Sequence, residues 1–159
     1  MKKKLKEFLK ESNLIEGVSD DDSLVQAKKS WDYCIGQEKM NSEVVLKTHK
    51  ILMSNQKLNK NEIGFFRKRP VYIGAREGLH YSHIEDSIGS WSTSMNCSIK
   101  EKISDNWKRL HVDFEYIHPF VDGNGRTGRI FLNWQRVRSG LPILIIKNIN
   151  KHNYYKWFL

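Results

Sequence analysis

Apolar residues recur at three- and four-residue intervals through most of the chain, which is the spacing of amphipathic helices. The longest such stripe consists of Ile103, Trp107, Leu110, Phe114 and Ile117. It predicts a helix with one continuous buried face. Because the residue before a proline avoids the helical region, this helix is expected to end at His118, which precedes Pro119.

Similar stripes predict further helices on both sides of this one. The expected helices are one from Leu5 that ends near Gly17, one from Leu24 to Ile35, one from Val45 to Met53, one over Ile84–Met95, one from about Gly125 to Ser139, and one with Tyr154, Tyr155 and Trp157 that runs to the last residue. The acidic run at residues 20–22 and the pair Asn41-Ser42 are typical helix caps.

The segment from Asn59 to Ser82 has a different pattern. It contains three glycines, one proline and the β-prone run Val71-Tyr72-Ile73, which together predict a hairpin or an extended flap. No other segment has the pattern of a sheet. The predicted fold class is therefore mainly α, with one small β-hairpin flap.

Composition narrows the function classes. The 159 residues include 27 Lys+Arg and 18 Asp+Glu, for a formal net charge of +9, and the length favours one domain. The sequence has neither a bilayer-spanning apolar run nor the apolar core of a secretory signal, so we expect a cytoplasmic protein. The basic excess favours a polyanion: nucleic acid, a membrane surface or nucleotide phosphates.

The residues that carry chemistry are concentrated in His118-Pro119-Phe120-Val121-Asp122-Gly123-Asn124-Gly125-Arg126-Thr127-Gly128-Arg129. Gly123 and Gly125 allow a turn whose backbone N–H groups converge on an anion at the start of a helix. Arg126 and Arg129 lie three residues apart, so both can reach the same polyphosphate. This segment therefore predicts an anion site.

Two further residues of this segment complete a plausible reaction centre. Asp122 is placed to hold a hard cation such as Mg²⁺, and His118 can accept a proton from a hydroxyl at near-neutral pH. These parts match phosphoryl-type transfer. The glycine spacing also fits a dinucleotide fingerprint, but a predicted helix precedes it where that motif requires a strand, which argues against a Rossmann site. The sequence contains no G-x-x-x-x-G-K-[ST] motif, which excludes a Walker-type nucleotide site.

The string HPFVDGNGRTGR resembles the signature of the Fic family, HPFx[DE]GNGRxxR, and agrees with it at every defined position. The resemblance covers about residues 40–159 and includes a flap-like segment with Gly64 to Arg67 and Val71 to Gly74, the helix residue Asn133, and the paired aromatics Tyr154 and Tyr155. It implies a helical Fic fold and transfer of AMP from ATP to a Ser, Thr or Tyr hydroxyl of a target protein.

The resemblance also implies a role for each matching residue. His118 would be the base that takes the hydroxyl proton, and Asp122 would hold Mg²⁺ between the α- and β-phosphates. The other implied nucleotide-binding residues are Gly123, Asn124 and Gly125 in the anion hole, Arg126 at the β-phosphate, Arg129 at the γ-phosphate, and Tyr154 and Tyr155 beside the adenine. Gly125 stands where kinase-type Doc relatives carry a lysine, which favours AMP transfer over phosphate transfer.

The first predicted helix ends in a segment, SNLIEG, that resembles the inhibitory motif [ST]xxxE[GN] of Fic proteins with an N-terminal brake. By this resemblance residues 1–18 form an inhibitory helix, with Ser12, Glu16 and Gly17 as its motif positions, and residues 19–159 form the Fic core. Glu16 paired with Arg129 would remove the cation that the γ-phosphate needs. The residues alone also fit an ordinary helix that ends at a C-cap glycine.

The flap is expected to bind the target. An exposed edge at Arg67, Val71, Tyr72 and Ile73 can pair with an extended target segment and present its hydroxyl to His118. A solvated edge protected by charged residues is the simpler alternative, and the resemblance favours target docking.

Three functions remain in competition. The favoured one is an autoinhibited, Mg²⁺-dependent protein adenylyltransferase, and the second is removal of AMP at the same site, with Glu16 positioning a water. The third is a basic nucleic-acid-binding or regulatory module without catalysis, and the intact motif argues against it. The expected partners are ATP and a target protein that the residues do not identify. No membrane partner is expected, and whether the chain forms a homo-oligomer stays open.

Overall fold

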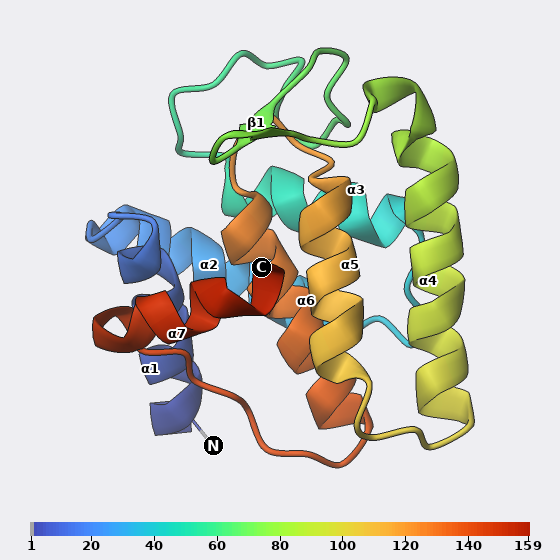
Figure 1. Cartoon of the computed structure of the whole chain (residues 1–159). Coiled ribbons are helices and arrows are strands. Elements are labelled where there is room, and N and C mark those ends of the chain that lie inside the picture. The colour runs from blue at the N-terminus through green and yellow to red at the C-terminus, as the bar shows by residue number, and fades with distance from the viewer. Residues whose placement is uncertain (1) are drawn as a thin grey trace.

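The computed structural model describes residues 2–159, which form seven helices and one two-stranded hairpin (Figure 1). The helices are α1 (Lys2–Ile15), α2 (Asp21–Ile35), α3 (Ser42–Leu52), α4 (Ile84–Lys100), α5 (Trp107–Ile117), α6 (Asn124–Arg138) and α7 (Lys151–Tyr155). The strands β1 (Tyr72–Ile73) and β2 (Arg76–Glu77) pair antiparallel, and the 3-10 turns are η1 (Tyr81–His83), η2 (Asn148–Asn150) and η3 (Lys156–Phe158). The predicted mainly α class with a small hairpin is confirmed.

Helix α6 lies in the middle of the molecule and packs against α1, α2, α3, α4 and α5 (Figure 1). Nearly all of its residues from Asn124 to Gln135 are buried. The rings of Trp91, Phe114 and Phe131 meet beside it, with centroids 5.1 to 5.5 Å apart. This packing holds the start of α6, where the glycine-rich turn ends, in a fixed position.

Two of the predicted helix caps are confirmed. At the start of α2, Asp20 Oδ1 accepts a hydrogen bond of 2.7 Å from the N–H of Ser23. At the start of α3, Asn41 Oδ1 accepts one of 2.9 Å from the N–H of Val44. Both caps satisfy N–H groups that have no partner within the helix.

The predicted start of the longest stripe is wrong, because α5 begins at Trp107 and Ile103 lies in the preceding loop. Helix α4 continues to Lys100, beyond its predicted end, and Lys102 then adopts a left-handed φ of 56°. Ser98 Oγ donates a hydrogen bond of 2.9 Å to the Ile103 carbonyl and holds this loop. A helix cannot run through a left-handed residue, so the stripe loses its first member.

The flap lies beside the α5–α6 connection, whereas the C-terminal segment crosses the front of the helices lower in the view (Figure 1). The hairpin turns at Gly74, whose φ is 63°, and lies at the end where α5 passes into α6 (Figure 1). The last predicted helix is shorter than expected: α7 ends at Tyr155 and η3 follows. Among residues 2–159, none of the helices is both long enough and apolar enough to cross a bilayer.

We expect Gly128→Ala to lower the free energy of unfolding by about 1–3 kcal/mol. An added Cβ would collide with Glu115 Oε1 and would lie 3.0 Å from Phe114 Cδ1 and 3.2 Å from His111 Cε1, so one carboxyl group and two rings of α5 would have to move. Gly89→Ala, on an exposed position of α4, is the matched control. Among residues 2–159 no atom lies within 4 Å of its added Cβ, so this substitution should stabilise by about 0.5–1 kcal/mol. Urea denaturation measures both, and equal effects would contradict close α5–α6 packing at Gly128.

Candidate active site

The loop between α5 and α6 contains three of the predicted site residues, His118, Asp122 and Gly123. It begins at His118, with a left-handed φ of 48°, and ends at Gly123, with a φ of 83°. The Phe120 N–H donates to Asn124 Oδ1 (2.9 Å), and Asn124 Nδ2 donates to the Phe120 carbonyl (2.8 Å). The side chain of Asn124 therefore fixes the shape of the loop, while its backbone begins α6.

His49 of α3 packs against this loop and hydrogen-bonds to it. Its ring stacks on Phe120 with centroids 3.6 Å apart. The Gly64 N–H donates to its Nδ1 (3.0 Å), so Nε2 carries the hydrogen and donates to the Asp122 carbonyl (2.8 Å). Burial lowers the pKa of His49 to about 4. His49 lies among the buried residues of α3, but nothing local in the sequence points to the loop as its partner.

Arg67 braces the flap against the same loop. Its backbone N–H donates to the Pro119 carbonyl (2.9 Å). Its guanidinium donates to a ring of backbone carbonyls, those of His118 (2.7 Å), Arg69 (3.0 Å), Ile117 (3.3 Å) and Leu79. Arg67 is only 3% exposed, so its predicted place on an exposed docking edge is corrected to a structural one.

The other predicted flap residues remain at the surface. Tyr72 is 70% exposed, and Val71 and Ile73 are half-buried. The flap therefore keeps an accessible edge beside the brace.

His118 is oriented to act as a proton acceptor. Its Nδ1 lies 3.2 Å from the Glu115 carbonyl, which can only accept. Nδ1 therefore carries the hydrogen, and Nε2 keeps a free lone pair. Burial lowers the pKa of His118 below its ordinary value, so the ring is neutral near pH 7 and Nε2 is available as a base.

Arg126 has a buried guanidinium with few hydrogen-bond acceptors around it among residues 2–159. The residue is 3% exposed, and its Nη2 lies 3.2 Å from Met53 Sδ. Within residues 2–159, its Nε and Nη1 find no hydrogen-bond partner. Since unpaired buried donors are costly, this arrangement is typical of a site that binds an anion.

Arg129, one turn further along α6, is bound by Ser12 of α1 and by Glu16, the residue directly after this helix. Its Nε donates to Ser12 Oγ (2.9 Å), and its Nη2 donates to the Ser12 carbonyl (2.9 Å) and to Glu16 Oε1 (2.8 Å). A Cβ at Gly125 would collide with the same Glu16 oxygen. The carboxylate of Glu16 therefore covers the first turn of α6, where backbone N–H groups and the helix dipole favour an anion.

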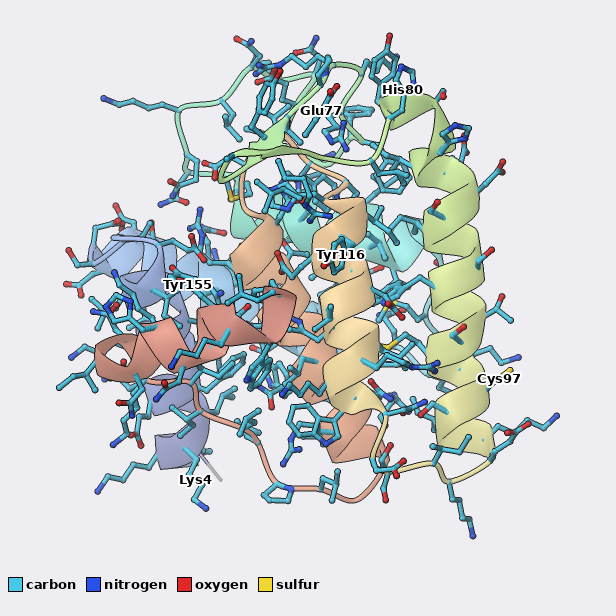
Figure 2. All side chains as sticks on the ribbon, in the orientation of Figure 1. Lys4, Glu77, His80, Cys97, Tyr116 and Tyr155 are labelled. Carbon is cyan, nitrogen blue, oxygen red and sulfur yellow. The ribbon has the colours of Figure 1, made fainter. Side chains whose placement is uncertain are left out.

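Tyr154 positions Arg129 and does not line an open pocket. His111 Nδ1 lies 3.2 Å from the Gly128 carbonyl and carries the hydrogen, so Nε2 accepts a hydrogen bond from the Tyr154 hydroxyl (2.8 Å). The hydroxyl oxygen in turn accepts from Arg129 Nη1 (3.3 Å). Tyr154 is 3% exposed, which argues against its implied place beside an adenine. Tyr155 is 42% exposed on α7 and remains accessible (Figure 2).

Asp122 fits a metal ion only in combination with phosphates. Its Oδ1 accepts from the Gly123 N–H (2.7 Å), and the side chain is exposed at a cavity of about 510 Å³. Among residues 2–159, no cluster of three or more His, Cys, Asp or Glu side chains could hold a metal. One carboxylate together with phosphate oxygens is the set that Mg²⁺ commonly takes.

The chain is similar to known proteins over most of its length. A model of the Fic/DOC family matches residues 39–135. A curated protein named "Protein adenylyltransferase Fic", from Aedes aegypti, is 29% identical over 120 residues, which are 71% of this chain and 23% of that protein. The protein of the same name from Drosophila erecta is 31% identical over 122 residues, 70% of this chain and 22% of its own. The chain thus spans less than a quarter of the length of these curated relatives.

A solved structure shares the fold. The Fic domain containing signaling protein of Bacteroides thetaiotaomicron superposes with a TM-score of 0.83 at 19% sequence identity, over 98% of this chain and 70% of that chain. The predicted helical Fic fold with a small flap is thereby confirmed.

We expect the wild-type chain to lose about 2 kcal/mol of unfolding free energy between about pH 7 and pH 5 through His49 alone. The pKa of His49 is about 4 in the folded state and 6.5 without burial. The unfolded state therefore takes up more protons as the pH falls, which destabilises the fold. His49→Gln removes this contribution, so its stability should fall less over the same range. Urea denaturation at both pH values tests this, and equal losses in the two proteins would contradict a neutral His49 in the folded state.

Proposed function

The chain belongs to the Fic/DOC family, and from this premise we propose that it is an autoinhibited protein adenylyltransferase, which transfers AMP from ATP to a Ser, Thr or Tyr hydroxyl of a target protein. The names of the curated relatives support this activity. The observation that carries the proposal is the buried guanidinium of Arg126, whose Nε and Nη1 have no partner within residues 2–159. These donors fit a phosphate at the start of α6, directly after the loop that begins at His118.

In the proposed reaction, the proton of the target hydroxyl goes to Nε2 of His118. The hydroxyl oxygen bonds to the α-phosphorus of ATP, and the bond from that phosphorus to the oxygen bridging to the β-phosphate breaks. The electron pair of that bond leaves with pyrophosphate, and His118 returns its proton to solvent. Arg126 would bind the β-phosphate and Arg129 the γ-phosphate, which stabilises the charge of the leaving group.

The turn before α6 supplies the remaining groups. Asn124 and Gly125 would present backbone N–H groups to the phosphates. The Gly123 N–H donates to Asp122 Oδ1, so Gly123 would contribute the turn that shapes the anion hole. Asp122 would hold Mg²⁺, which when bound neutralises part of the phosphate charge.

We also propose that residues 1–18 inhibit the core formed by residues 19–159. The Arg129 guanidinium is 2% exposed, and the contacts to Ser12 and Glu16 take up its Nε and Nη2. A γ-phosphate that binds Arg129 must therefore displace the Glu16 carboxylate, since both need the same donors. Gly17, with a φ of 72°, lets the chain turn away directly after Glu16.

Glu16→Gly should raise ATP-dependent AMP incorporation at least about tenfold, because loss of the ion pair with Arg129 frees the guanidinium for the γ-phosphate. Glu16→Gln keeps the helix and should act in the same direction. Incubation with labelled ATP, Mg²⁺ and a cell lysate, followed by mass spectrometry, measures the transfer and identifies the target. Glu7→Gln is the matched control, since Glu7 lies on the same helix in an exposed pair with Lys147 and should not affect the rate.

The possible outcomes separate the competing functions. No increase in the Glu16→Gly variant would contradict the proposed inhibition. His118→Ala in that variant should abolish transfer while ATP binding persists. Incubation of the wild type with AMP-modified protein in the absence of ATP tests the reverse reaction, and release of AMP there would favour removal of AMP as the activity.

The flap is the proposed docking edge for the target. Tyr72 of β1 is exposed, and Arg67 ties the flap to the backbone of His118 and Pro119. An extended target segment that pairs with this edge would be held in a fixed relation to His118.

Tyr72→Ala should raise the KM for the target about tenfold and leave ATP binding unchanged, because it removes an exposed aromatic contact and preserves the Arg67 brace. The control is Ile149→Ala, which removes an 84% exposed apolar side chain from η2. Steady-state kinetics in the Glu16→Gly variant measure both. A KM for the target that is the same in both variants would contradict docking on the flap.

A further inference from the structure

Glu115 lies one turn before His118 on α5, and its side chain turns inward. Its Oε2 is 3.8 Å from His118 Nδ1, and the side chain is 12% exposed. Its Oε1 lies against Gly128 of α6, where an added Cβ would collide with it. The next residue, Tyr116, lies on the outer face of α5 and is 40% exposed (Figure 2). Glu115 therefore belongs to the interior face that carries His118.

This carboxyl group is not explained by the packing of the fold. Within the described part of the chain, Glu115 Oε1 is buried and has no hydrogen-bond partner. A buried carboxyl group without a hydrogen-bond partner destabilises the fold, so its presence calls for a functional explanation. The ionisable group that its other oxygen faces at close range is the ring of His118.

We propose that Glu115 is a positioning residue of the transfer reaction, whose carboxylate holds the His118 ring by its Nδ1 side and stabilises the positive charge that the ring acquires. This inference rests on the proposed function. When the target hydroxyl gives its proton to Nε2, the ring carries hydrogen on both nitrogens, and Nδ1–H still faces the Glu115 carbonyl and carboxylate. A nearby carboxylate lowers the free energy of that protonated state, as an acidic partner does for other catalytic histidines.

The surroundings of Glu115 connect this role to the inhibitory helix. Ionisable groups from each packed element face its carboxyl group: Arg129 of α6, Glu16 of α1, Tyr154 of α7, and His111 and His118 on either side of it along the chain.

Burial raises the pKa of Glu115 to about 7, the charge of Arg129 lowers it, and the carboxylate of Glu16 raises it. Near pH 7 the group is thus divided between its neutral and charged forms while Glu16 is in place. Departure of Glu16 removes a neighbouring negative charge and favours the carboxylate form. Glu16 would therefore lower the negative charge of the Glu115 carboxyl group beside His118, in addition to occupying Arg129.

The experiment compares Glu115→Gln with the control Asp113→Asn, both in the Glu16→Gly variant. Gln keeps the shape of the side chain and removes its charge, and Asp113 is an exposed carboxylate on the same helix. The pKa of His118 is measured by NMR titration of the ring, and transfer is followed across pH. Glu115→Gln should lower the His118 pKa by about one unit and kcat about tenfold, and move the acid limb of kcat to lower pH. The KM for ATP should stay unchanged, and Asp113→Asn should alter none of these.

Two readouts keep the outcomes apart. In the chain that retains Glu16, Glu115→Gln should shift the His118 pKa less, because Glu115 is partly protonated there. An identical His118 titration with and without Glu115 in the Glu16→Gly variant would overturn the inference, as would an unaltered pH profile of kcat. If His118 titrates as expected but no variant transfers AMP, the pairing is supported and the proposed function fails.

Discussion

Arg129 carries its positive charge in the interior, where the residue is 2% exposed, and such a charge has to be paired with an anion and with hydrogen-bond acceptors. Helix α1 supplies the carboxylate of Glu16 and two oxygens of Ser12, and α7 supplies the hydroxyl of Tyr154. Helices from opposite ends of the chain are therefore held to α6 by one guanidinium. Without Glu16, the groups that hydrogen-bond to this guanidinium within residues 2–159 are all neutral, which favours binding of another anion.

Arg126 is in a different situation, although it lies only one turn earlier on α6. Asp122, Glu16 and Asp20 offset its charge from a distance. Its Nε and Nη1, however, have no acceptor within residues 2–159. An anion can add hydrogen bonds there without displacing a protein group, whereas at Arg129 it must displace Glu16. Under the proposed function, a β-phosphate would therefore bind the inhibited chain readily, and the competition with Glu16 would concern the γ-phosphate.

The part of this site that the sequence predicts is the part whose contacts are local. The caps at Asp20 and Asn41 and the turn before α6 follow from spacing within a few residues. The contact between Glu16 and Arg129 spans 113 positions, and only a family resemblance pointed to it. The burial of Arg67 and Tyr154 could not be predicted from their neighbours in the sequence. Arg67 is buried by carbonyl groups about fifty residues away, and Tyr154 contacts a guanidinium 25 residues away.

Release of Glu16 does not require α1 to leave the core. Phe8 and Leu9 are each 2% exposed and Ile15 is 4% exposed, so these side chains anchor the helix. Exposing them would cost about 1.5–3 kcal/mol for each large apolar side chain. The Glu16 side chain, by contrast, is 38% exposed, and turning it toward solvent breaks one ion pair directly after the end of α1. Under the proposed function, an anion that competes for Arg129 would thus displace a side chain and not a helix, so the same fold would serve the inhibited and the active state.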